Sequence, residues 1–311
     1  MALPRAWAES PLVAFIQLSR IKFLGGVLLL YLLGAAMAWG ELARLDGAIL
    51  ILGLGATWAT QLMTHYLNEY WDWETDRVTT LQGARTAFSG GSGVLADGLL
   101  PRSVALWAGA ACTLLALTLG AVLVATLQTG PYTLALLAIS LGVGYFYSSP
   151  PLRLQARGVG EAATSITVGM LVPAGAYYLQ TGQFSPTLTL ATLPLAFTLF
   201  AMVLGVHLPD YDADRATGKL NLVARLGPRR AARLAGISIL AGYLLNGLET
   251  GWGLVPPMLA TMQLSAPLAL IALIAMLRLD QSETHLRAIP FWGVALFASA
   301  SAAVLLGMLL A

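Results

Sequence analysis

Two acidic clusters have the residue types and the spacing of a divalent-metal site. In the first cluster, Asn68, Asp72 and Asp76 are four residues apart, so on a helix of about 100° per residue they share one stripe. In the second cluster, Asp210 and Asp214 share a stripe in the same way. These side chains offer only oxygen ligands, and Mg²⁺ is typically held by one or two carboxylates together with substrate phosphates. Two facing stripes could therefore hold metal ions with a diphosphate between them.

Other acidic residues of the two clusters lie off these stripes. Glu69 and Glu74 point elsewhere, and Asp212 turns away from its stripe, so we expect Asp212 to be a solvated neighbour rather than a ligand. A single Asp-x-x-x-Asp spacing often marks only a solvated helix end. Here each cluster follows about twenty apolar residues, at 47–67 and 188–209. A carboxylate at the edge of the hydrocarbon costs free energy unless a cation meets it, which favours the metal site.

The composition excludes a soluble globular protein. Of the 311 residues, 58% are hydrophobic and 10% are charged, and the mean hydropathy is +0.75, so too little polar surface exists to cover a globule. We expect an all-α, polytopic membrane protein. Apolar stretches of about twenty residues are long enough to cross a bilayer as helices. They predict nine spans, near residues 12–39, 46–69, 102–126, 131–149, 160–180, 187–209, 231–250, 253–277 and 288–310.

The basic residues predict the orientation. With nine spans, sixteen of the seventeen Lys and Arg residues fall on one side of the membrane, and only Arg44 falls on the other. By the positive-inside rule that side is cytoplasmic, which places the N-terminus and both acidic clusters on the cytoplasmic face. The bias suits an anionic substrate, although topology and contact with anionic lipid explain most of these arginines. We expect a location in a prokaryotic cell membrane.

The chain also contains a weak internal repeat. An offset of 142 residues aligns His65 with His207, Asn68 with Asp210, Asp72 with Asp214 and Arg77 with Lys219. This predicts two related helical halves, about 12–149 and 160–310, within one integral-membrane domain of residues 1–311. Each of the two histidines lies one turn before a stripe and could be a zinc ligand or a base. A hydrogen-bonding role behind the metal ligands is favoured, because no cysteine accompanies the three histidines of the chain.

Three segments resemble the UbiA superfamily of intramembrane prenyltransferases. They are the first acidic cluster with SGGSGVL at 89–95, YFYSSPPLRL at 145–154 with RGVGE at 157–161, and DYDADRATGK at 210–219. The motifs occur in the family's order, and the match spans nearly the whole chain. The resemblance implies two metal-binding Asp-rich motifs above a central lipid-accessible cavity, Mg²⁺, and transfer of a polyprenyl group from its diphosphate to an acceptor.

The Ser-Gly-Gly-Ser stretch is similar to the menaquinone-type branch of this family, which prenylates 1,4-dihydroxy-2-naphthoate. Two positions depart from the family's pattern: Asn221 stands where Thr is usual, and the first stripe includes Trp-Asp-Trp at 71–73. These departures leave the acceptor open. The expected partners are a polyprenyl diphosphate, an aromatic acceptor that is a quinone precursor, and membrane lipid, with no nucleic acid.

The resemblance and the residue chemistry together assign roles at the site. Mg²⁺, for which Mn²⁺ could substitute, would neutralise the leaving diphosphate, and its expected ligands are Asn68, Asp72, Asp76, Asp210 and Asp214. The expected diphosphate-binding cations are Arg77, Arg153, Lys219 and, by resemblance to a basic pair that opens the first helix, Arg20 and Lys22. An allylic carbocation then forms and an aromatic carbon attacks it. Tyr147 could stabilise that cation through its π face or anchor its helix at the membrane interface; with the four aspartates it forms the expected catalytic set.

A glycine-rich cytoplasmic connection precedes the third predicted span. Its glycines, at 83, 90, 91, 93 and 98, would let backbone amides approach an anion closely. The segment could be a linker, but Arg85 and its place directly after the first acidic stripe favour a cap over the diphosphate. Pro150 and Pro151 end the fourth predicted helix, which makes Arg153 a loop residue able to turn inward.

Other functions are compatible with parts of the pattern. A terpene cyclase on the same scaffold would ionise the diphosphate in the same way and quench the cation internally. A membrane transporter is the alternative from another class, because acidic residues in membrane helices often mark ion paths. Its coupling carboxylates should lie near the bilayer midplane, whereas these lie at helix ends. A purely structural membrane protein leaves the paired stripes unexplained. The prenyl chain length, the oligomeric state and the organism stay open.

Overall fold

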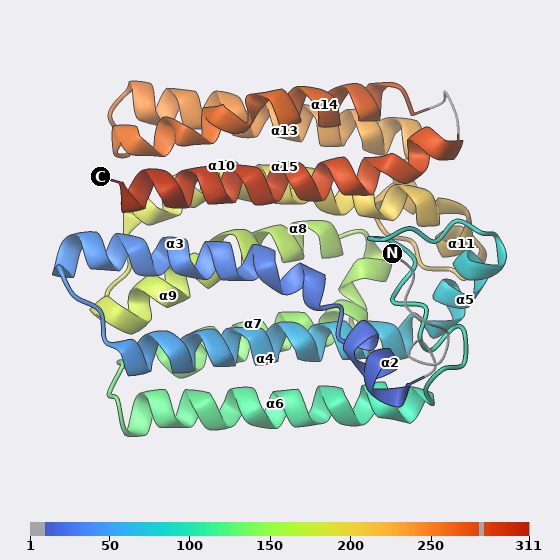
Figure 1. The fold of residues 1–311 in the computed structure, drawn as a ribbon, viewed down its shortest axis with the longest axis horizontal. Coiled ribbons are helices and arrows are strands. Elements are labelled where there is room, and N and C mark those ends of the chain that lie inside the picture. Colours follow the sequence, from blue (N-terminus) through green and yellow to red (C-terminus); the bar gives the residue numbers. More distant parts are fainter. Residues whose placement is uncertain (1–9, 280–282, 311) are drawn as a thin grey trace.

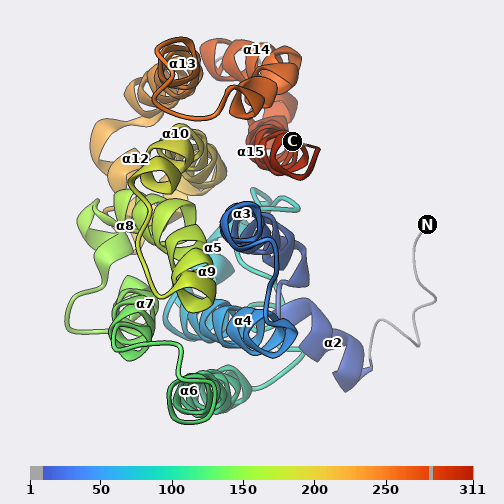
Figure 2. The same ribbon diagram turned by 90° about the vertical axis from the view of Figure 1, so that its left-hand side faces the viewer.

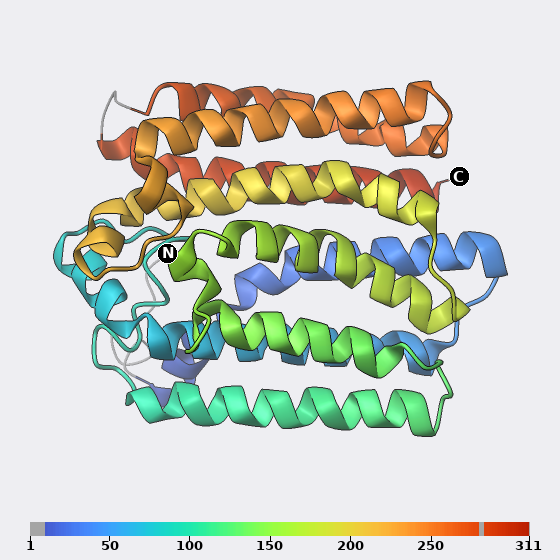
Figure 3. The same ribbon diagram turned by 180° about the vertical axis from the view of Figure 1, so that it is seen from behind.

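The computed structural model describes residues 10–279 and 283–310, and over this part of the chain it consists of helices and the loops that join them. The long helices lie nearly parallel to one another in a single bundle (Figure 1). Seen from behind, α7, α8 and α9 cover the bundle in the middle of its height (Figure 3). The all-α fold expected from the sequence is confirmed for the described residues.

The first half of the chain contains α2 (Pro11–Leu18), η1 (Ile21–Phe23), α3 (Leu24–Leu42), α4 (Gly47–Trp71), α5 (Trp73–Leu81), α6 (Arg102–Ala125) and α7 (Thr133–Ser148). The second half contains η2 (Leu154–Arg157), α8 (Gly160–Ile166), η3 (Thr167–Leu171), α9 (Val172–Thr181), α10 (Pro186–His207), η4 (Leu208–Asp210), α11 (Tyr211–Ala216), α12 (Leu222–Leu226), α13 (Pro228–Gly251), η5 (Pro257–Ser265), α14 (Ala266–Leu277) and α15 (Glu283–Leu309).

Eight helical segments of the described chain are long and apolar enough to cross a membrane. They are Pro11–Leu42, Gly47–Trp71, Arg102–Ala125, Gly160–Thr181, Pro186–Ala216, Pro228–Gly251, Pro257–Leu277 and His285–Leu309. The predicted span at 131–149 corresponds to α7, which has 16 residues. Such a helix rises about 24 Å, less than the roughly 30 Å of a hydrocarbon core. The chain is therefore a polytopic membrane protein, and the count of nine spans is not confirmed.

The bundle is elongated in cross-section. Seen end-on, α6 lies at one edge, α13 and α14 lie at the opposite edge, and the remaining long helices lie between them (Figure 2). The most extensive helix pairs are α4 with α6 and α10 with α13. α10 is buried between two apolar clusters, one shared with α3, η5 and α15 and the other shared with α13, α14 and α15. This packing fixes α10, which leads to the second acidic cluster.

Helices α3 and α9 meet closely at the middle of the bundle. A Cβ on Gly34 would lie 2.0 Å from the backbone oxygen of Pro173, so only glycine permits this approach. Small residues at helix contacts are characteristic of membrane bundles, where close backbone packing replaces the hydrophobic effect. Both helices line the cavity that contains the candidate site.

Both acidic clusters lie where a long helix is interrupted at the same end of the bundle. α4 ends at Trp71, and α5 begins after Asp72. α10 ends at His207, where Pro209 lacks the backbone N–H that would continue it, and η4 and α11 follow. Helices α5 and α11 contact each other and lie at the right-hand edge in Figure 1. The two clusters, far apart in sequence, are thereby brought together.

Candidate active site

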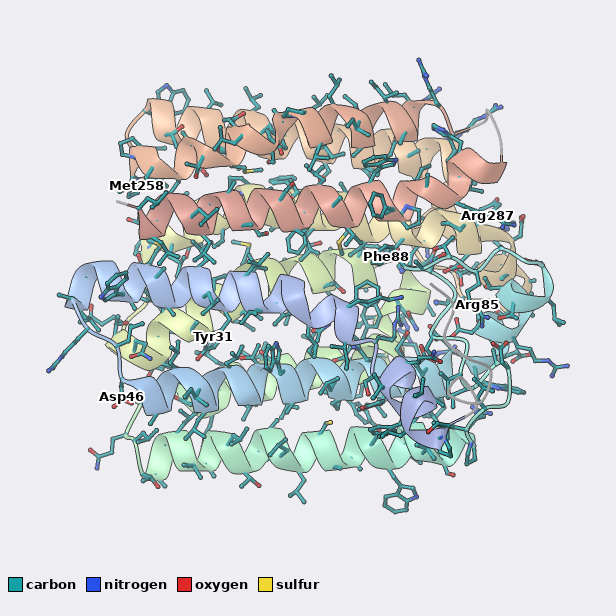
Figure 4. All side chains as sticks on the ribbon, viewed as in Figure 1. Tyr31, Asp46, Arg85, Phe88, Met258 and Arg287 are labelled. Atoms are coloured by element: carbon teal, nitrogen blue, oxygen red, sulfur yellow. The ribbon has the colours of Figure 1, made fainter. Side chains whose placement is uncertain are left out.

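One cavity of about 280 Å³ lies between α3, α4, α7, α9, α10 and α15. Its charged end is lined by Asn68, Asp72, Asp76, Asp210 and Lys219. The rest is mainly apolar, and along α4 the lining runs from Gly53 to Asn68, or roughly 22 Å of helix. Two lining residues, Tyr31 and Phe88, lie toward opposite ends of the bundle (Figure 4). A cluster of charges thus stands at the head of a long apolar channel.

Asp72 is held from three sides at the charged end. Lys219 Nζ donates to its Oδ2 at 2.7 Å, and Asn68 Nδ2 donates to the same oxygen at 2.8 Å. Gln155 Nε2 lies 2.6 Å from Oδ1 and 2.8 Å from Oδ2. Asp72 is 3% exposed. These contacts join the first acidic cluster to the loop after α7 and to the loop after α11.

Lys219 is the cation between the two acidic clusters. Besides its bond to Asp72, its Nζ lies 3.5 Å from Asp214 Oδ1. Burial alone would lower the pKa of Lys219, but the negative charges of Asp214, Asp72 and Asp76 outweigh burial and raise that pKa well above its ordinary value. The ammonium group is therefore charged and available to an anion. Its inward direction follows from Gly218, whose φ of +73° ends α11 in a conformation that glycine adopts readily.

The two aspartates of the second cluster have different surroundings. Asp210 Oδ2 accepts a hydrogen bond from the backbone N–H of Gly90 at 3.0 Å, and Asp210 lines the cavity. Asp214 is fully buried, and Asn221 Nδ2 donates to its Oδ2. Within the described chain Asp214 does not line the cavity. The structure thus brings Asp210 to the cavity and places Asp214 behind Lys219.

Asp76 completes the carboxylates that line the charged end. A Cβ on Gly91 would lie 2.2 Å from Asp76 Oδ2, and Gly91 has a φ of +68°, so the loop backbone approaches this carboxyl group in a way that only glycine allows. Burial, followed by the charges of Glu69 and Asp72, holds the pKa of Asp76 well above its ordinary value, and Lys219 opposes that rise. A bound cation would favour the ionised form of such a group.

The donor set of this site fits a hard divalent cation. Among the described residues, no three His, Cys, Asp or Glu side chains already form a metal cluster. All candidate donors are oxygens, however, and the buried Oδ1 atoms of Asp210 and Asp214 accept no hydrogen bond from described residues. A buried carboxylate oxygen without a partner is costly. Mg²⁺ with few protein ligands and substrate phosphates as the others satisfies such a set.

Of the basic pair that opens the first span, only Arg20 reaches the cavity. Its Nη1 donates to Asn68 Oδ1 at 3.1 Å and lies 3.7 Å from Glu69 Oε1, and the side chain lines the cavity. Lys22 is exposed and donates to the backbone oxygen of Ala87. It therefore binds the glycine-rich loop and does not line the charged end.

Arg77 and Arg153, both predicted to bind a diphosphate, are exposed and lie outside the cavity lining of the described chain. The guanidinium carbon of Arg77 lies 5.7 Å from the ring centroid of Trp73. This outward position follows from helix geometry, because Arg77 is adjacent to the inward-facing Asp76. Arg153 has a left-handed backbone, with a φ of +44°, that starts the η2 turn. That turn buries Gln155 at the site in place of Arg153.

The glycine-rich connection lines the charged end, as the predicted cap requires. Phe88, Ser89, Gly90 and Gly91 line the cavity. Glu69, which is 1% exposed, fastens the loop: its Oε1 accepts from Ser92 N at 2.6 Å and its Oε2 accepts from Ser92 Oγ at 2.7 Å. The loop is thus held to α4 through both oxygens of one carboxylate.

Three residues form contacts at the site that the sequence did not predict. Gln155 binds Asp72, Glu69 binds the loop, and Asn221 binds Asp214. Only Asn221 carried a usable signal, because it is the N-cap of α12, with Oδ1 accepting from Ala224 N at 2.8 Å, and Asn is a preferred N-cap residue. Gln155 and Glu69 act through tertiary contacts that no local pattern reports.

Tyr147 and the two repeated histidines line the cavity next to the charged end. His65 Nδ1 lies 3.2 Å from the backbone oxygen of Ser19, and its Nε2 lies 2.9 Å from Gln61 Nε2. His207 Nδ1 lies 3.1 Å from Glu161 Oε1. Both imidazoles are thus oriented by hydrogen bonds to residues other than the expected metal ligands, and their role stays a prediction.

The membrane bundle with a charged cavity above an apolar channel defines an intramembrane enzyme. A model of the UbiA prenyltransferase family matches residues 27–300, so the chain belongs to that family. The resemblance seen in the sequence motifs is confirmed, and the protein is a membrane-embedded prenyltransferase. Family membership favours the enzyme over the transporter alternative.

Curated relatives have related names. The chain is 25% identical to 1,4-dihydroxy-2-naphthoate octaprenyltransferase of Bacillus subtilis (strain 168), over 76% of this chain and 75% of that protein. It is 27% identical to the protein of the same name from Escherichia coli (strain K12), over 77% of this chain and 79% of that protein. A 2-carboxy-1,4-naphthoquinone phytyltransferase of Synechocystis is 30% identical, over only 37% of this chain and 38% of that protein.

Solved structures share the fold. A UbiA homologue from Aeropyrum pernix K1 superposes with a TM-score of 0.60 at 18% identity, over 89% of this chain and 97% of that one. A UbiA homologue from Archaeoglobus fulgidus, bound to GPP and Mg²⁺, gives a TM-score of 0.59 at 16% identity, over 92% of this chain and 99% of that one. At these identities the likeness establishes the fold.

Proposed function

We propose that this protein transfers a polyprenyl group from a polyprenyl diphosphate to an aromatic quinone precursor, with 1,4-dihydroxy-2-naphthoate as the first acceptor to test. The observation that supports this proposal most directly is the cavity. Its charged end is lined by Asp72, Asp76, Asp210 and Lys219, and the rest of it is an apolar channel. A polyprenyl diphosphate has the same division into an anionic head and a long apolar tail. The names of the two bacterial relatives that match three quarters of the chain support the choice of acceptor.

Mg²⁺, or Mn²⁺ in its place, is the metal that this donor set fits. The residues that would hold it are Asn68, Asp72, Asp76 and Asp210, which line the cavity, with Asp214 adjacent to them. When bound, the metal would neutralise the charge that develops on the leaving diphosphate. Support comes from the all-oxygen donors and from the buried Oδ1 atom of Asp210, which accepts no hydrogen bond from described residues.

The side chains of the charged end bind and orient the diphosphate. Arg20 and Lys219 are the basic residues that line the cavity within the described chain, so they contact the anion directly. Lys219 already forms ion pairs with Asp72 and Asp214. A bound diphosphate would also interact with its positive charge. Electrostatic groups that are preorganised in a dry site stabilise developing charge at little reorganisation cost.

The apolar channel holds the prenyl tail, and the reacting carbon lies just below the charged end. Tyr147 lines the cavity on α7, where its π face would stabilise an allylic cation. The loop residues Phe88 and Gly90 cover the charged end and exclude water, which would otherwise capture the cation. Attack by an aromatic carbon then completes the transfer.

The test uses purified protein in detergent or nanodiscs with Mg²⁺. Prenyl diphosphates of several lengths are combined with a panel of aromatic acids, and products are identified by mass spectrometry. We expect a prenylated naphthoate-derived product and stoichiometric diphosphate. A cyclic hydrocarbon or alcohol formed without any acceptor would identify a terpene cyclase instead. Asp72→Asn is the matched inactive control, because it keeps the shape of the side chain and removes its charge.

We further propose that the charged end faces the cytoplasm of a prokaryotic cell. The positive-inside bias supports this orientation. Arg44 is exposed in the connection between α3 and α4, which lies at the opposite end of the bundle from α5 (Figure 1). In a Cys112→Ser background, Glu74→Cys and Arg44→Cys place single thiols at exposed positions of opposite ends. Labelling of intact cells with an impermeant maleimide should modify Arg44→Cys only. Labelling of Glu74→Cys alone would reverse the orientation.

A further inference from the structure

His65 and His207 occupy equivalent places in the sequence repeat, but their ring nitrogens are used differently. The backbone oxygen of Ser19 can only accept, so Nδ1 of His65 carries the proton and donates to it at 3.2 Å. Nε2 of His65 must then accept from the Gln61 side-chain amide, which lies 2.9 Å away. Both nitrogens of His65 are occupied, so His65 cannot exchange a proton with a substrate without breaking one of these bonds.

His207 has one occupied and one open nitrogen. Its Nδ1 donates to Glu161 Oε1 at 3.1 Å, and no described residue forms a hydrogen bond with its Nε2. Glu161 is fully buried and is itself fixed by the backbone N–H of Leu222, which lies 2.9 Å from the same oxygen. A carboxylate on one nitrogen sets the tautomer and leaves the lone pair of the other nitrogen free. Because His207 lines the cavity, a bound molecule can reach this lone pair.

The depth of His207 matches the reacting end of the substrate. His207 ends α10 and precedes Asp210 by the three residues of the 3-10 helix η4, which is roughly 6 Å along the axis. It therefore lies just below the carboxylates, on the channel side, with Tyr147 lining the same cavity. A base at this level is close to an aromatic acceptor and is separated from the diphosphate oxygens.

We propose that Nε2 of His207 accepts the hydroxyl proton of the aromatic acceptor and that Glu161 is the residue that positions it; this rests on the proposed prenyl transfer. The O–H bond breaks and its electron pair stays on oxygen, which makes the ring carbon a stronger nucleophile. The C1–O bond of the prenyl diphosphate breaks and its electron pair leaves with diphosphate, and the ring carbon then forms a bond to C1 of the resulting allylic cation. The ring C–H proton then passes to diphosphate, and His207 returns its proton to the oxygen, which restores the aromatic phenol.

The test compares His207→Gln with His65→Gln, a matched control at the equivalent repeat position. Each purified variant is assayed with 1,4-dihydroxy-2-naphthoate and with ring-fluorinated analogues whose hydroxyl groups have lower pKa values. General bases contribute about 100- to 10,000-fold, so we expect His207→Gln to lose about 100-fold with the parent acceptor. With an acceptor that is already ionised at the assay pH, the loss should shrink at least tenfold. His65→Gln should lose the same factor with every acceptor.

Ionisation of the prenyl diphosphate supplies a second readout. Because His207 acts on the acceptor, His207→Gln should still release diphosphate, and water should capture the cation as prenyl alcohol. An equal loss with all acceptors, or the same behaviour as His65→Gln, would overturn the assignment of His207 as the base. Transfer by the wild-type protein would still support the proposed function in that case. Absence of transfer by the wild type with every acceptor would overturn both.

Glu161 is tested as a positioning residue. Glu161→Asp keeps a carboxylate and should restore part of the rate that Glu161→Gln loses. The loss in Glu161→Gln should again depend on the acidity of the acceptor and should fall on kcat more than on the KM for prenyl diphosphate. Equal losses for the two substitutions with all acceptors would leave Glu161 with a purely structural role and would contradict this part of the proposal.

Discussion

Thr75 and Thr217 contact each other across the two acidic clusters, with their hydroxyl oxygens 2.8 Å apart. The separation of these residues is 142 positions, the offset of the sequence repeat. A residue that contacts its own repeat partner lies next to the axis that relates the two halves. The Ser19–His65 and Glu161–His207 contacts are related by the same offset. Both observations support the two related halves, which stay a prediction.

The Thr75–Thr217 contact predicts an unequal pair of substitutions. The Thr217 hydroxyl also bonds the backbone oxygen of Ala213 at 2.9 Å, so Thr75 is the donor to Thr217. Thr75→Val removes one hydrogen bond, or about 0.5–1.5 kcal/mol, whereas Thr217→Val leaves a buried donor unpaired, at about 1–3 kcal/mol. In thermal unfolding Thr217→Val should be the less stable variant, and the double variant should be no worse than Thr217→Val. Additive losses would contradict the assigned donor.

Substitutions of the aspartates should have different effects on activity, depending on whether the carboxylate is buried at the site. Asp214 and Asp72 are buried and share Lys219, whereas Asp212 is exposed. Asp72→Asn and Asp214→Asn should lower prenyl transfer by about 100-fold or more, with normal insertion and monodisperse elution. Asp212→Asn should stay within about threefold of wild type. Comparable losses in all three variants would rule out the stripe geometry inferred from the spacing.

Removal of divalent metal should abolish turnover reversibly. At the charged end, Asn68, Asp72, Asp76 and Asp210 offer oxygen donors, and such a set selects Mg²⁺ or Mn²⁺ over softer metals. Incubation with EDTA should stop transfer, and addition of excess Mg²⁺ should restore it, with Mn²⁺ able to substitute. Electron paramagnetic resonance should show Mn²⁺ bound to the wild type and less bound to Asp210→Asn. Full turnover in chelator would exclude the metal.

The structure separates basic residues that the sequence grouped together. Lys219 is buried between two carboxylates, whereas Arg153 is exposed outside the cavity. Lys219→Gln should raise the KM for prenyl diphosphate by about tenfold or more and leave the KM for the acceptor little changed. Arg153→Gln is the control and should be nearly silent. If the two variants titrate alike, Lys219 is not at the diphosphate.

Regular elements explain what could be predicted. The stripe of Asn68, Asp72 and Asp76 follows from spacing alone, because the i+4 backbone bonds Asp72 N to Asn68 O (2.8 Å) and Asp76 N to Asp72 O (2.9 Å) persist across the break after α4. The exposed position of Asp212, off the stripe of Asp210 and Asp214, also follows from spacing alone. The repeat aligns Arg77 with Lys219, but the two side chains do not have equivalent positions. Arg77 lies within α5, whereas Lys219 follows Gly218 in a turn.

Irregular elements position the site residues that the sequence did not predict. Gln155 reaches Asp72 only because the left-handed backbone of Arg153 starts the η2 turn, and no periodic pattern signals such a turn. Glu69 lies off the stripe, so its spacing predicts no role, yet the loop that folds back over α4 buries it. The predicted span at 131–149 matches α7 to within two residues at each end, and whether this short helix crosses the membrane stays a prediction.

Gln155 gives a test of contacts that only tertiary structure reveals. Its side-chain amide approaches both oxygens of Asp72 and is 2.9 Å from Ser148 Oγ. Gln155→Leu removes these donors while roughly keeping the volume, so Asp72 should lose its orientation and the rate of transfer should fall by about 10- to 100-fold. Gln155→Glu should be worse, because it adds a negative charge beside Asp72. Wild-type rates in both variants would show that Gln155 does not position Asp72.

The final prediction concerns the fastening of the glycine-rich loop. Ser92 gives Glu69 two hydrogen bonds, at 2.6 Å and 2.7 Å, and its hydroxyl also accepts from Val94 N at 3.2 Å. Ser92→Ala keeps the backbone bond and removes the other two, so the loop should open more often. We expect faster amide exchange over residues 83–98, a higher KM for prenyl diphosphate and more prenyl alcohol from captured water. Ser299→Ala, on α15, removes a hydroxyl that bonds only its own helix and should change none of these quantities. Unchanged exchange in Ser92→Ala would mean that the backbone bonds of Ser92 to Glu69 and of Gly90 to Asp210 hold the loop closed without the Ser92 hydroxyl.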